Sequence, residues 1–394
     1  MLAPCFVPIA NSLLSFLSFH LALHTSYWSI RVFFFASFLG FSIFSFTKSK
    51  YLYLFPDLTS LWAQTVVLSI VHTTSLLFIE RWPAPPRDQK NPSWSASLRA
   101  TYWLWSNPQL LPEASKSTSR NEKEEQSLPV FLLLRLSKLP LYYYLHTRVI
   151  PCFFAEAISE LYPEDVDQTG LLTRLPDVTT REVVVRSWIA MSWIWDSVVY
   201  LDGTNAVLAS FAVLTGLDQP ADWPPLFAQP SAACGLRNFW SRFWHQLAAR
   251  PYKGVARVVV RGIGSVWGKM PTSVSRALLA FVVFLLSGLS HMAVSWHLGM
   301  RDTLDVQWFL LNFAGCLGET VVLSAVRYLA KRAGCVRELN MIERSWLGRM
   351  AGFTWVFAFF FWSVPLWKYP RLHKELMVRD RWLAIFSKMT IVEG

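Results

Sequence analysis

The sequence predicts an all-α, polytopic membrane protein. Hydrophobic residues make up 53% of its 394 positions, and 20 Trp and 29 Phe exceed what a soluble chain of this length usually carries. Several apolar runs are long enough, or nearly so, to cross an apolar layer that needs about 20 helical residues, so we expect roughly seven to nine transmembrane helices. The runs lie near residues 5–22, 28–46, 58–79, 130–154, 184–201, 204–217, 275–298, 304–330 and 350–368.

Two stretches fit this pattern least well. Prolines break the run 130–154, and Asp196, Asp202 and Gly203 interrupt the stretch 184–217. A membrane segment that carries charged residues usually faces the protein interior or a polar cavity. We therefore expect the second stretch to be bent or partly re-entrant.

Three parts follow one another along the chain. Residues 1–80 are expected to form the N-terminal transmembrane helices, and the first run, which lacks a basic start and a clear cleavage site, is interpreted as a retained signal anchor. Residues 81–128 end in a mixed-charge tract without apolar side chains and are expected to form a flexible polar loop, in which 102–105 is a candidate short interfacial element. Residues 129–394 form the remaining part.

A purely basic segment lies between Trp223 and Arg301, where no Asp or Glu occurs. The positive-inside rule places the loop 235–276, which carries these basic residues, on the cytoplasmic side. Its charge fits either anionic lipid headgroups or an anionic cosubstrate. Nucleic acid is excluded as a partner, because the basic residues flank membrane helices and no recognition module is present. The basic residues are Arg237, Arg242, Arg250, Lys253, Arg257, Arg261, Lys269 and Arg276.

His291 is an ionisable residue in the middle of the apolar run 278–296. An ionisable side chain at this depth is costly, so a functional role is the default hypothesis. Helical spacing places Ser287, His291 and Ser295 on one face, with Gly288 beside them. Two readings remain open for the residue: a neutral core histidine bonded to a neighbouring helix, or a general base.

The segment 236–246 combines aromatic, basic and imidazole side chains at high density. If it is helical, one face carries aromatic and basic residues and an adjoining face carries Arg242 and His245. Anchoring at the membrane interface is the alternative role for such residues. The candidate binding residues in this segment are Arg237, Asn238, Trp240, Arg242 and Trp244.

The sequence Phe239-Trp-Ser-Arg-Phe-Trp-His245, followed by the Leu-Ser-Gly-Leu-Ser-His291 helix, resembles the wax-synthase-like branch of the membrane-bound O-acyltransferase family. The likeness is greatest to fungal members that acetylate terpenoid and meroterpenoid alcohols. The first sequence is also similar to the acyl-donor motif of diacylglycerol and sterol acyltransferases, which usually ends in Asn where this chain has His245. Members of this branch commonly carry a pair of basic residues in this motif, and this chain has Phe243 at the second position of the pair. The specific motifs cover about residues 235–299.

The resemblance implies an acyltransferase core over 129–394, with a motif loop at 235–276 and a histidine helix at 277–298 around an acyl-transfer tunnel. It assigns the catalytic histidine to His291 and the second polar position to His245. It implies acetyl-CoA, or another acyl-CoA, as cosubstrate and no tightly bound cofactor. The implied acceptor is a lipophilic alcohol dissolved in the membrane lipids. The implied location is the endoplasmic reticulum membrane, which the protein crosses several times.

Acyl transfer suits these residues chemically. A buried, neutral His291 would remove the proton of the acceptor hydroxyl, and His245 or Asn238 would stabilise or position the oxyanion. Ser287 and Ser295 would orient the imidazole. A thioester is already activated, so no serine or cysteine nucleophile is required.

Other classes of protein remain as alternatives. A long-chain wax-ester or sterol acyltransferase would use the same residues. A transporter with His291 as a proton relay should contain inverted repeats, and the sequence shows no internal repeat. A non-catalytic assembly subunit is the third alternative. The five cysteines are widely spaced, and no Cys/His pattern predicts a metal site or a disulfide framework.

Overall fold

The structure is a computed structural model of the whole chain, and it confirms the all-α class. Seven of its helices are long and apolar enough to cross a membrane, within the range expected from the sequence. In the part of the chain that the structure describes, every regular element is a helix. The described residues are 3–52, 58–83, 94–111, 127–154, 161–268 and 270–392. The protein is therefore an integral, multi-pass membrane protein. The seven helices span Phe6–His24, Trp28–Leu52, Leu58–Ile79, Thr180–Leu214, Thr272–His297, Leu304–Ala333 and Trp346–Arg381.

The chain divides into two compact units. Unit 1 contains Met1–Leu111 and Gln246–Phe313, and unit 2 contains Pro112–His245 and Ala314–Gly394. Helix α12 (Leu304–Ala333) contributes its first part to unit 1 and the rest to unit 2. Both units are discontinuous in sequence, so neither coincides with one of the three consecutive parts expected from the sequence.

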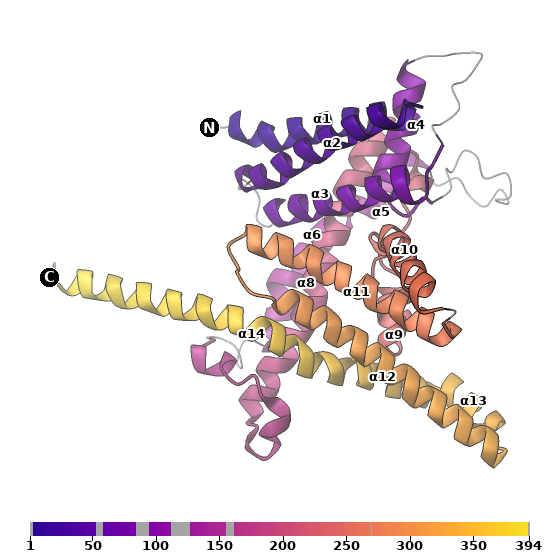
Figure 1. Cartoon of the computed structure of the whole chain (residues 1–394). Coiled ribbons are helices and arrows are strands. Elements are labelled where there is room, and N and C mark those ends of the chain that lie inside the picture. The colour runs from indigo at the N-terminus through magenta and orange to yellow at the C-terminus, as the bar shows by residue number, and fades with distance from the viewer. Residues whose placement is uncertain are drawn as a thin grey trace. The chain divides into compact units, whose positions relative to one another are not determined.

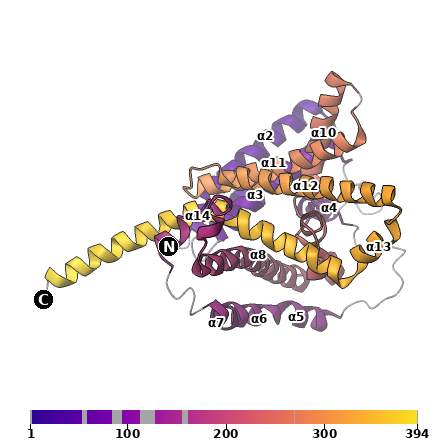
Figure 2. The same cartoon turned by 90° about the horizontal axis from the view of Figure 1, so that it is seen from below.

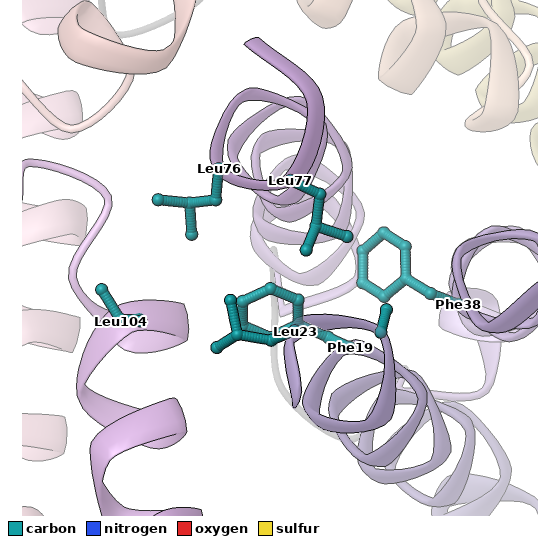
Figure 3. Close-up of a cluster of buried hydrophobic side chains, with 7 residues drawn as sticks. Phe19, Leu23, Phe38, Leu76, Leu77 and Leu104 are labelled. Carbon is teal, nitrogen blue, oxygen red and sulfur yellow. The ribbon is translucent and has the colours of Figure 1, made fainter. Parts of the chain in front are cut away.

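In unit 1, α1 (Phe6–His24), α2 (Trp28–Lys48) and α3 (Leu58–Thr74) pack against one another in that order (Figure 1). A cluster of buried side chains joins α1 and α2 to the π-helical turn η3 (Ser75–Ile79) that continues α3 (Figure 3). Close packing of such side chains holds membrane helices together where water is absent. The cluster consists of Phe19, Ala22, Leu23, Phe38, Leu76, Leu77 and Leu104.

The polar loop expected at 81–128 contains an ordered helix, α4 (Trp94–Ser106). Its Leu104 belongs to the buried cluster, and His72 of α3 bonds to the Leu104 carbonyl oxygen at 2.8 Å. The interfacial element expected at 102–105 is therefore the end of a longer, packed helix. The mixed-charge tract that ends the loop lies outside the described residues, apart from Ser127.

In unit 2, the runs expected at 184–201 and 204–217 form one continuous helix, α8 (Thr180–Leu214). Asp202 does not break it, because its buried carboxylate accepts hydrogen bonds from Lys138 (2.8 Å) and Tyr142 (2.7 Å). A buried charge that is paired and hydrogen-bonded is tolerated within a helix. Burial of the phenol raises the pKa of Tyr142, and the Asp202 carboxylate adds to this rise.

The run 130–154 forms short pieces that lie along α8 (Figure 2) and are not among the seven long helices: α5 (Leu128–Leu136), α6 (Lys138–Tyr144), η5 (Leu145–Val149) and α7 (Ile150–Phe154). Its prolines do break it, because proline cannot donate the backbone hydrogen bond that a helix interior needs. The C-terminal part of unit 2 consists of α13 (Val336–Arg344) and the long α14 (Trp346–Val392), which packs on α8.

Candidate active site

His291 lies in the last two turns of α11 (Thr272–His297), and its imidazole stacks on the ring of Phe309 in α12. The ring centroids are 5.0 Å apart with an interplanar angle of 23°. The side chain of His291 is exposed, whereas the neighbouring Ser290 and Ser295 are buried. The expectation of a buried imidazole is therefore wrong: α11 turns its serine and glycine side toward its neighbours and leaves the histidine at the edge of that contact.

Gly288 permits this contact between α11 and α12. A Cβ atom at Gly288 would lie 2.9 Å from Cα of Val306 and 3.2 Å from Cβ of Phe309, so the two backbones approach too closely for any side chain. Ser287, which the sequence placed beside the imidazole, donates its hydroxyl proton to the Val283 carbonyl at 2.9 Å. Its oxygen can still accept a hydrogen bond from an imidazole N–H.

Helix α10 (Ala249–Trp267) precedes the histidine helix and packs on it. The hydroxyl groups of Tyr252 and Ser290 are 2.5 Å apart, and both side chains are buried. Burial raises the pKa of Tyr252, so this phenol stays neutral at physiological pH. Neither residue stands out in the sequence, because a tyrosine and a serine in separate helices form no motif.

Arg250 also fixes α10. Its guanidinium pairs with Glu80, which additionally accepts hydrogen bonds from Trp82 (2.9 Å) and Ser75 (3.0 Å). Burial lowers the pKa of Arg250, an effect that Glu80 opposes. Arg250 is therefore a structural member of the basic segment, whereas Lys253, Arg257 and Arg261 on the same helix are exposed.

Two buried polar residues of α12 were missed by the sequence analysis. Asp305 and Asn312 are 1% and 0% exposed and lie on the face of α12 that also carries Trp308 and Phe309. Asn312 donates to the Trp308 carbonyl at 2.8 Å. Asp305 is the second residue of α12 and follows the polar residues 301–303, so it does not interrupt an apolar run as His291 does.

The motif segment in unit 2 is not a regular helix. One short turn, α9 (Leu236–Asn238), passes into a π-helical turn, η11 (Phe239–Phe243), and the chain is extended at Trp244. The facial arrangement expected for a continuous helix is therefore wrong. Phe239 and Phe243 are buried, whereas Arg237, Ser241 and Arg242 are exposed.

The aromatic residues of the motif form a cluster with α8 and α14. Trp193 of α8 stacks on Trp244 with centroids 5.2 Å apart, and Trp244 stacks on Phe239 at 5.3 Å. Trp240 contacts Trp193 at 6.3 Å, and Phe360 of α14 contacts Phe239 at 4.8 Å. Trp240 and Trp244 therefore anchor the motif to the helices of its own unit through aromatic contacts.

His245 ends this cluster, with ring contacts to Trp244 (5.6 Å) and Phe227 (5.8 Å). Asn238 donates one amide N–H to the Cys234 carbonyl at 2.7 Å, which leaves the other N–H as a candidate oxyanion donor. Burial raises the pKa of the Cys234 thiol, which packs against the Arg349 carbonyl.

The described residues include no group of three or more His, Cys, Asp or Glu side chains that could hold a metal ion. His291 belongs to unit 1 and residues 237–245 belong to unit 2; the boundary falls at the peptide bond after His245.

Residues 223–311 match the sequence model of the membrane bound O-acyl transferase family. The match includes the motif segment and the histidine helix, so the resemblance seen in these residues is confirmed. No solved structure matches the chain.

Fungal acetyltransferases are among the similar proteins. Acetyltransferase atnC of Arthrinium sp is 26% identical over 243 residues, which are 60% of this chain and 54% of that protein. Acetyltransferase spyB of Aspergillus fumigatus is 29% identical over 185 residues, 45% of this chain and 30% of that protein. Acetyltransferase TRI7 of Fusarium sporotrichioides is 27% identical over 202 residues, 50% of this chain and 44% of that protein. The chain thus spans about half the length, or less, of these relatives.

Proposed function

We propose that the protein is a membrane O-acyltransferase that transfers an acyl group, acetyl from acetyl-CoA, to a hydroxyl of a lipophilic acceptor. The observation that carries the proposal is the family match at 223–311, which contains both the motif segment and His291. The acetyltransferase names of the fungal relatives support acetyl as the transferred group. The proposed acceptor is a secondary metabolite such as a terpenoid or meroterpenoid alcohol, as the resemblance of the motif implies. The proposed location is the endoplasmic reticulum membrane.

In the proposed reaction, neutral His291 is the general base. Its imidazole takes the proton of the acceptor hydroxyl while the hydroxyl oxygen attacks the thioester carbonyl carbon. The tetrahedral intermediate then collapses, the C–S bond breaks, and the leaving sulfur of coenzyme A takes the proton back from the imidazolium. The products are an ester and free coenzyme A, and no covalent enzyme intermediate forms. His245, or the second amide N–H of Asn238, stabilises the oxyanion.

The exposure of His291 supports this role. A base must contact the acceptor hydroxyl within hydrogen-bond reach, and a fully enclosed core histidine would not do so. Stacking on Phe309 limits the rotation of the ring. The close contact at Gly288 then fixes the ring's position relative to α12.

The charge distribution of the motif supports an anionic donor. Arg237 and Arg242 are exposed, and among the described residues neither side chain forms an ion pair or a hydrogen bond. A guanidinium group matches the geometry of phosphate, and coenzyme A carries several phosphates. The aromatic contacts of Trp240 and Trp244 keep the turn that presents these arginines in one conformation.

The proposal is tested by an assay of the full chain in purified membranes. Radiolabelled acetyl-CoA and palmitoyl-CoA are supplied separately with a panel of hydroxylated terpenoids and with long-chain alcohols. We expect label from acetyl-CoA to enter a terpenoid ester. Transfer from palmitoyl-CoA to a long-chain alcohol alone would favour the wax-ester alternative, and no transfer from either donor would refute the proposal.

A further inference from the structure

We propose that Glu319 of α12 is the positioning residue of the motif: it holds the main chain at the start of 236–245 and thereby orients Arg237 and Arg242. The inference rests on the proposed function for its kinetic consequences. All contacts that carry it lie within unit 2.

The carboxylate of Glu319 binds two consecutive backbone N–H groups. Its Oε2 atom accepts from Leu236 N at 2.6 Å, and its Oε1 atom accepts from Arg237 N at 3.3 Å. These N–H groups open the first turn of the motif and therefore have no partner within that turn. A carboxylate acceptor makes such hydrogen bonds about twice as strong as neutral ones.

A third donor fixes the carboxylate itself. Trp355 of α14 donates its indole N–H to Oε2 of Glu319 at 2.8 Å. A half-buried carboxylate in a membrane helix is costly unless it is hydrogen-bonded, and this carboxylate accepts hydrogen bonds from three donors in two other segments. Glu319 therefore joins α12, α14 and the motif at one point.

Two glycines beside Glu319 leave room for these hydrogen bonds. Gly235 has φ +94°, and a Cβ atom there would lie 3.3 Å from Oε1 of Glu319. One turn earlier in α12, a Cβ atom at Gly315 would lie 2.7 Å from the Leu236 side chain and 2.5 Å from the ring of Phe359. The left-handed conformation of Gly235, which favours glycine, aims the following N–H groups at the carboxylate.

The consequence for the site follows from the turn. Phe239 and Phe243 point into the aromatic cluster, while Arg237 and Arg242 stay on the exposed side. If the first two N–H groups lose their acceptor, the whole turn is free to shift, and both guanidinium groups move with it. The Glu319 carboxylate itself repels phosphate, so its removal alone would favour acyl-CoA. Because the turn is also released, we expect loss of Glu319 to weaken acyl-CoA binding.

Two variants separate positioning from general destabilisation. Glu319→Ala removes both acceptor atoms, whereas Glu319→Gln keeps the size and one acceptor oxygen. We expect the apparent KM for acyl-CoA to rise roughly tenfold in Glu319→Ala and by less in Glu319→Gln, with the KM for the alcohol unchanged. The matched control is Glu343→Gln, because Glu343 is a carboxylate of the same unit that pairs with Arg327 at 3.2 Å.

A second readout does not depend on activity. In a full-length protein whose other four cysteines are replaced, Cys234 directly precedes Gly235 and reports on the same backbone. Removal of the Glu319 charge by itself lowers the pKa of the Cys234 thiol, and both Glu319 variants share this effect. We therefore expect a small thiol reagent to modify Cys234 several-fold faster in Glu319→Ala than in Glu319→Gln, with Glu343→Gln matching the parent. Equal labelling rates, or equal shifts of both KM values, would overturn the inference. If the parent protein shows no acyl transfer, the proposed function fails, and the labelling rates still decide whether Glu319 holds the turn.

Discussion

The phenolic oxygen of Tyr252 lies 2.5 Å from the hydroxyl oxygen of Ser290, the residue that directly precedes His291. Ser290 donates its own proton to the Leu286 carbonyl at 2.8 Å, so Tyr252 is the donor of this pair. The hydrogen bond links α10 to the histidine helix and sets the rotation of that helix next to the proposed base.

We predict that Tyr252→Phe lowers both thermal stability and turnover. Loss of one buried hydrogen bond costs about 1 kcal/mol, and a small rotation of α11 would displace the imidazole. Thermal inactivation in detergent and the kcat of the surviving enzyme measure the two effects. Tyr143→Phe is the control, because Tyr143 is 72% exposed. Equal behaviour of the two variants would show that the Tyr252 contact has no role.

Gly288→Ala should be strongly destabilising, although it adds only one methyl group. The new Cβ atom would lie 2.9 Å from Cα of Val306, and a backbone atom cannot move aside as a flexible side chain can. We expect a loss of about 1–3 kcal/mol and a large fall in activity. Gly262→Ala provides the matched control in a helix, because nothing lies within 4 Å of a Cβ atom there. A stable and active Gly288→Ala protein would contradict the close contact between α11 and α12.

Arg242→Ala should raise the apparent KM for acyl-CoA more than that for the alcohol. The guanidinium is exposed, and in the proposed function it binds a phosphate of acyl-CoA with two parallel hydrogen bonds, which lysine cannot reproduce. Arg242→Lys is therefore expected between the parent and Arg242→Ala in steady-state assays. Arg337→Ala, at an exposed arginine of α13, should leave both constants unchanged. Equal shifts for both substrates in Arg242→Ala would indicate a structural role for this arginine.

The segment from Cys234 to Arg276 is predicted to face the cytoplasm, and labelling at Gly262→Cys tests this orientation. Gly262 is exposed on α10, whereas Gly254 is packed against Ser75 and would not report cleanly. In sealed microsomes, a membrane-impermeant thiol reagent should modify Gly262→Cys in a protein without its native cysteines. Modification only after permeabilisation would reverse the topology.

A protein that retains Cys234 as its single cysteine allows the pH dependence of this thiol's labelling to be measured. Burial raises its pKa, so less of the reactive thiolate is present near neutral pH than for an ordinary cysteine. Its labelling should therefore be slow at pH 7 and should accelerate as the pH rises through the elevated pKa.

Much of the fold followed from composition and run length, because about 20 apolar residues are needed to cross a bilayer regardless of tertiary detail. The interruptions were harder to interpret. Asp202 looked like a helix break, but its pairing with Lys138 and Tyr142 depends on where α6 packs, and no local pattern records that contact.

For the candidate site, the sequence identified the histidine and the motif because both are unusual within apolar surroundings. It did not identify Glu319, Asp305 or Tyr252. The partners of Glu319 and Tyr252 lie far along the chain, and the burial of Asp305 depends on how its helix packs, so only the folded structure shows why these residues matter. The exposure of His291 was also not predictable, since helical spacing fixes which residues share a face but not which neighbour covers that face.

The most direct test of the account is acyl transfer by His291→Ala and His291→Gln, compared with the parent and with His146→Ala. His146 is an exposed histidine of η5, with 54% of its side chain accessible, and has no proposed role in transfer. Initial rates of labelled ester formation are measured at equal amounts of membrane-inserted protein.

Loss of a general base is worth about two to four orders of magnitude in rate, and glutamine keeps a hydrogen bond but no basicity. We expect both His291 variants to be nearly inactive and His146→Ala to match the parent. Near-normal turnover by a correctly inserted His291→Ala protein would contradict the assignment of His291 as the base.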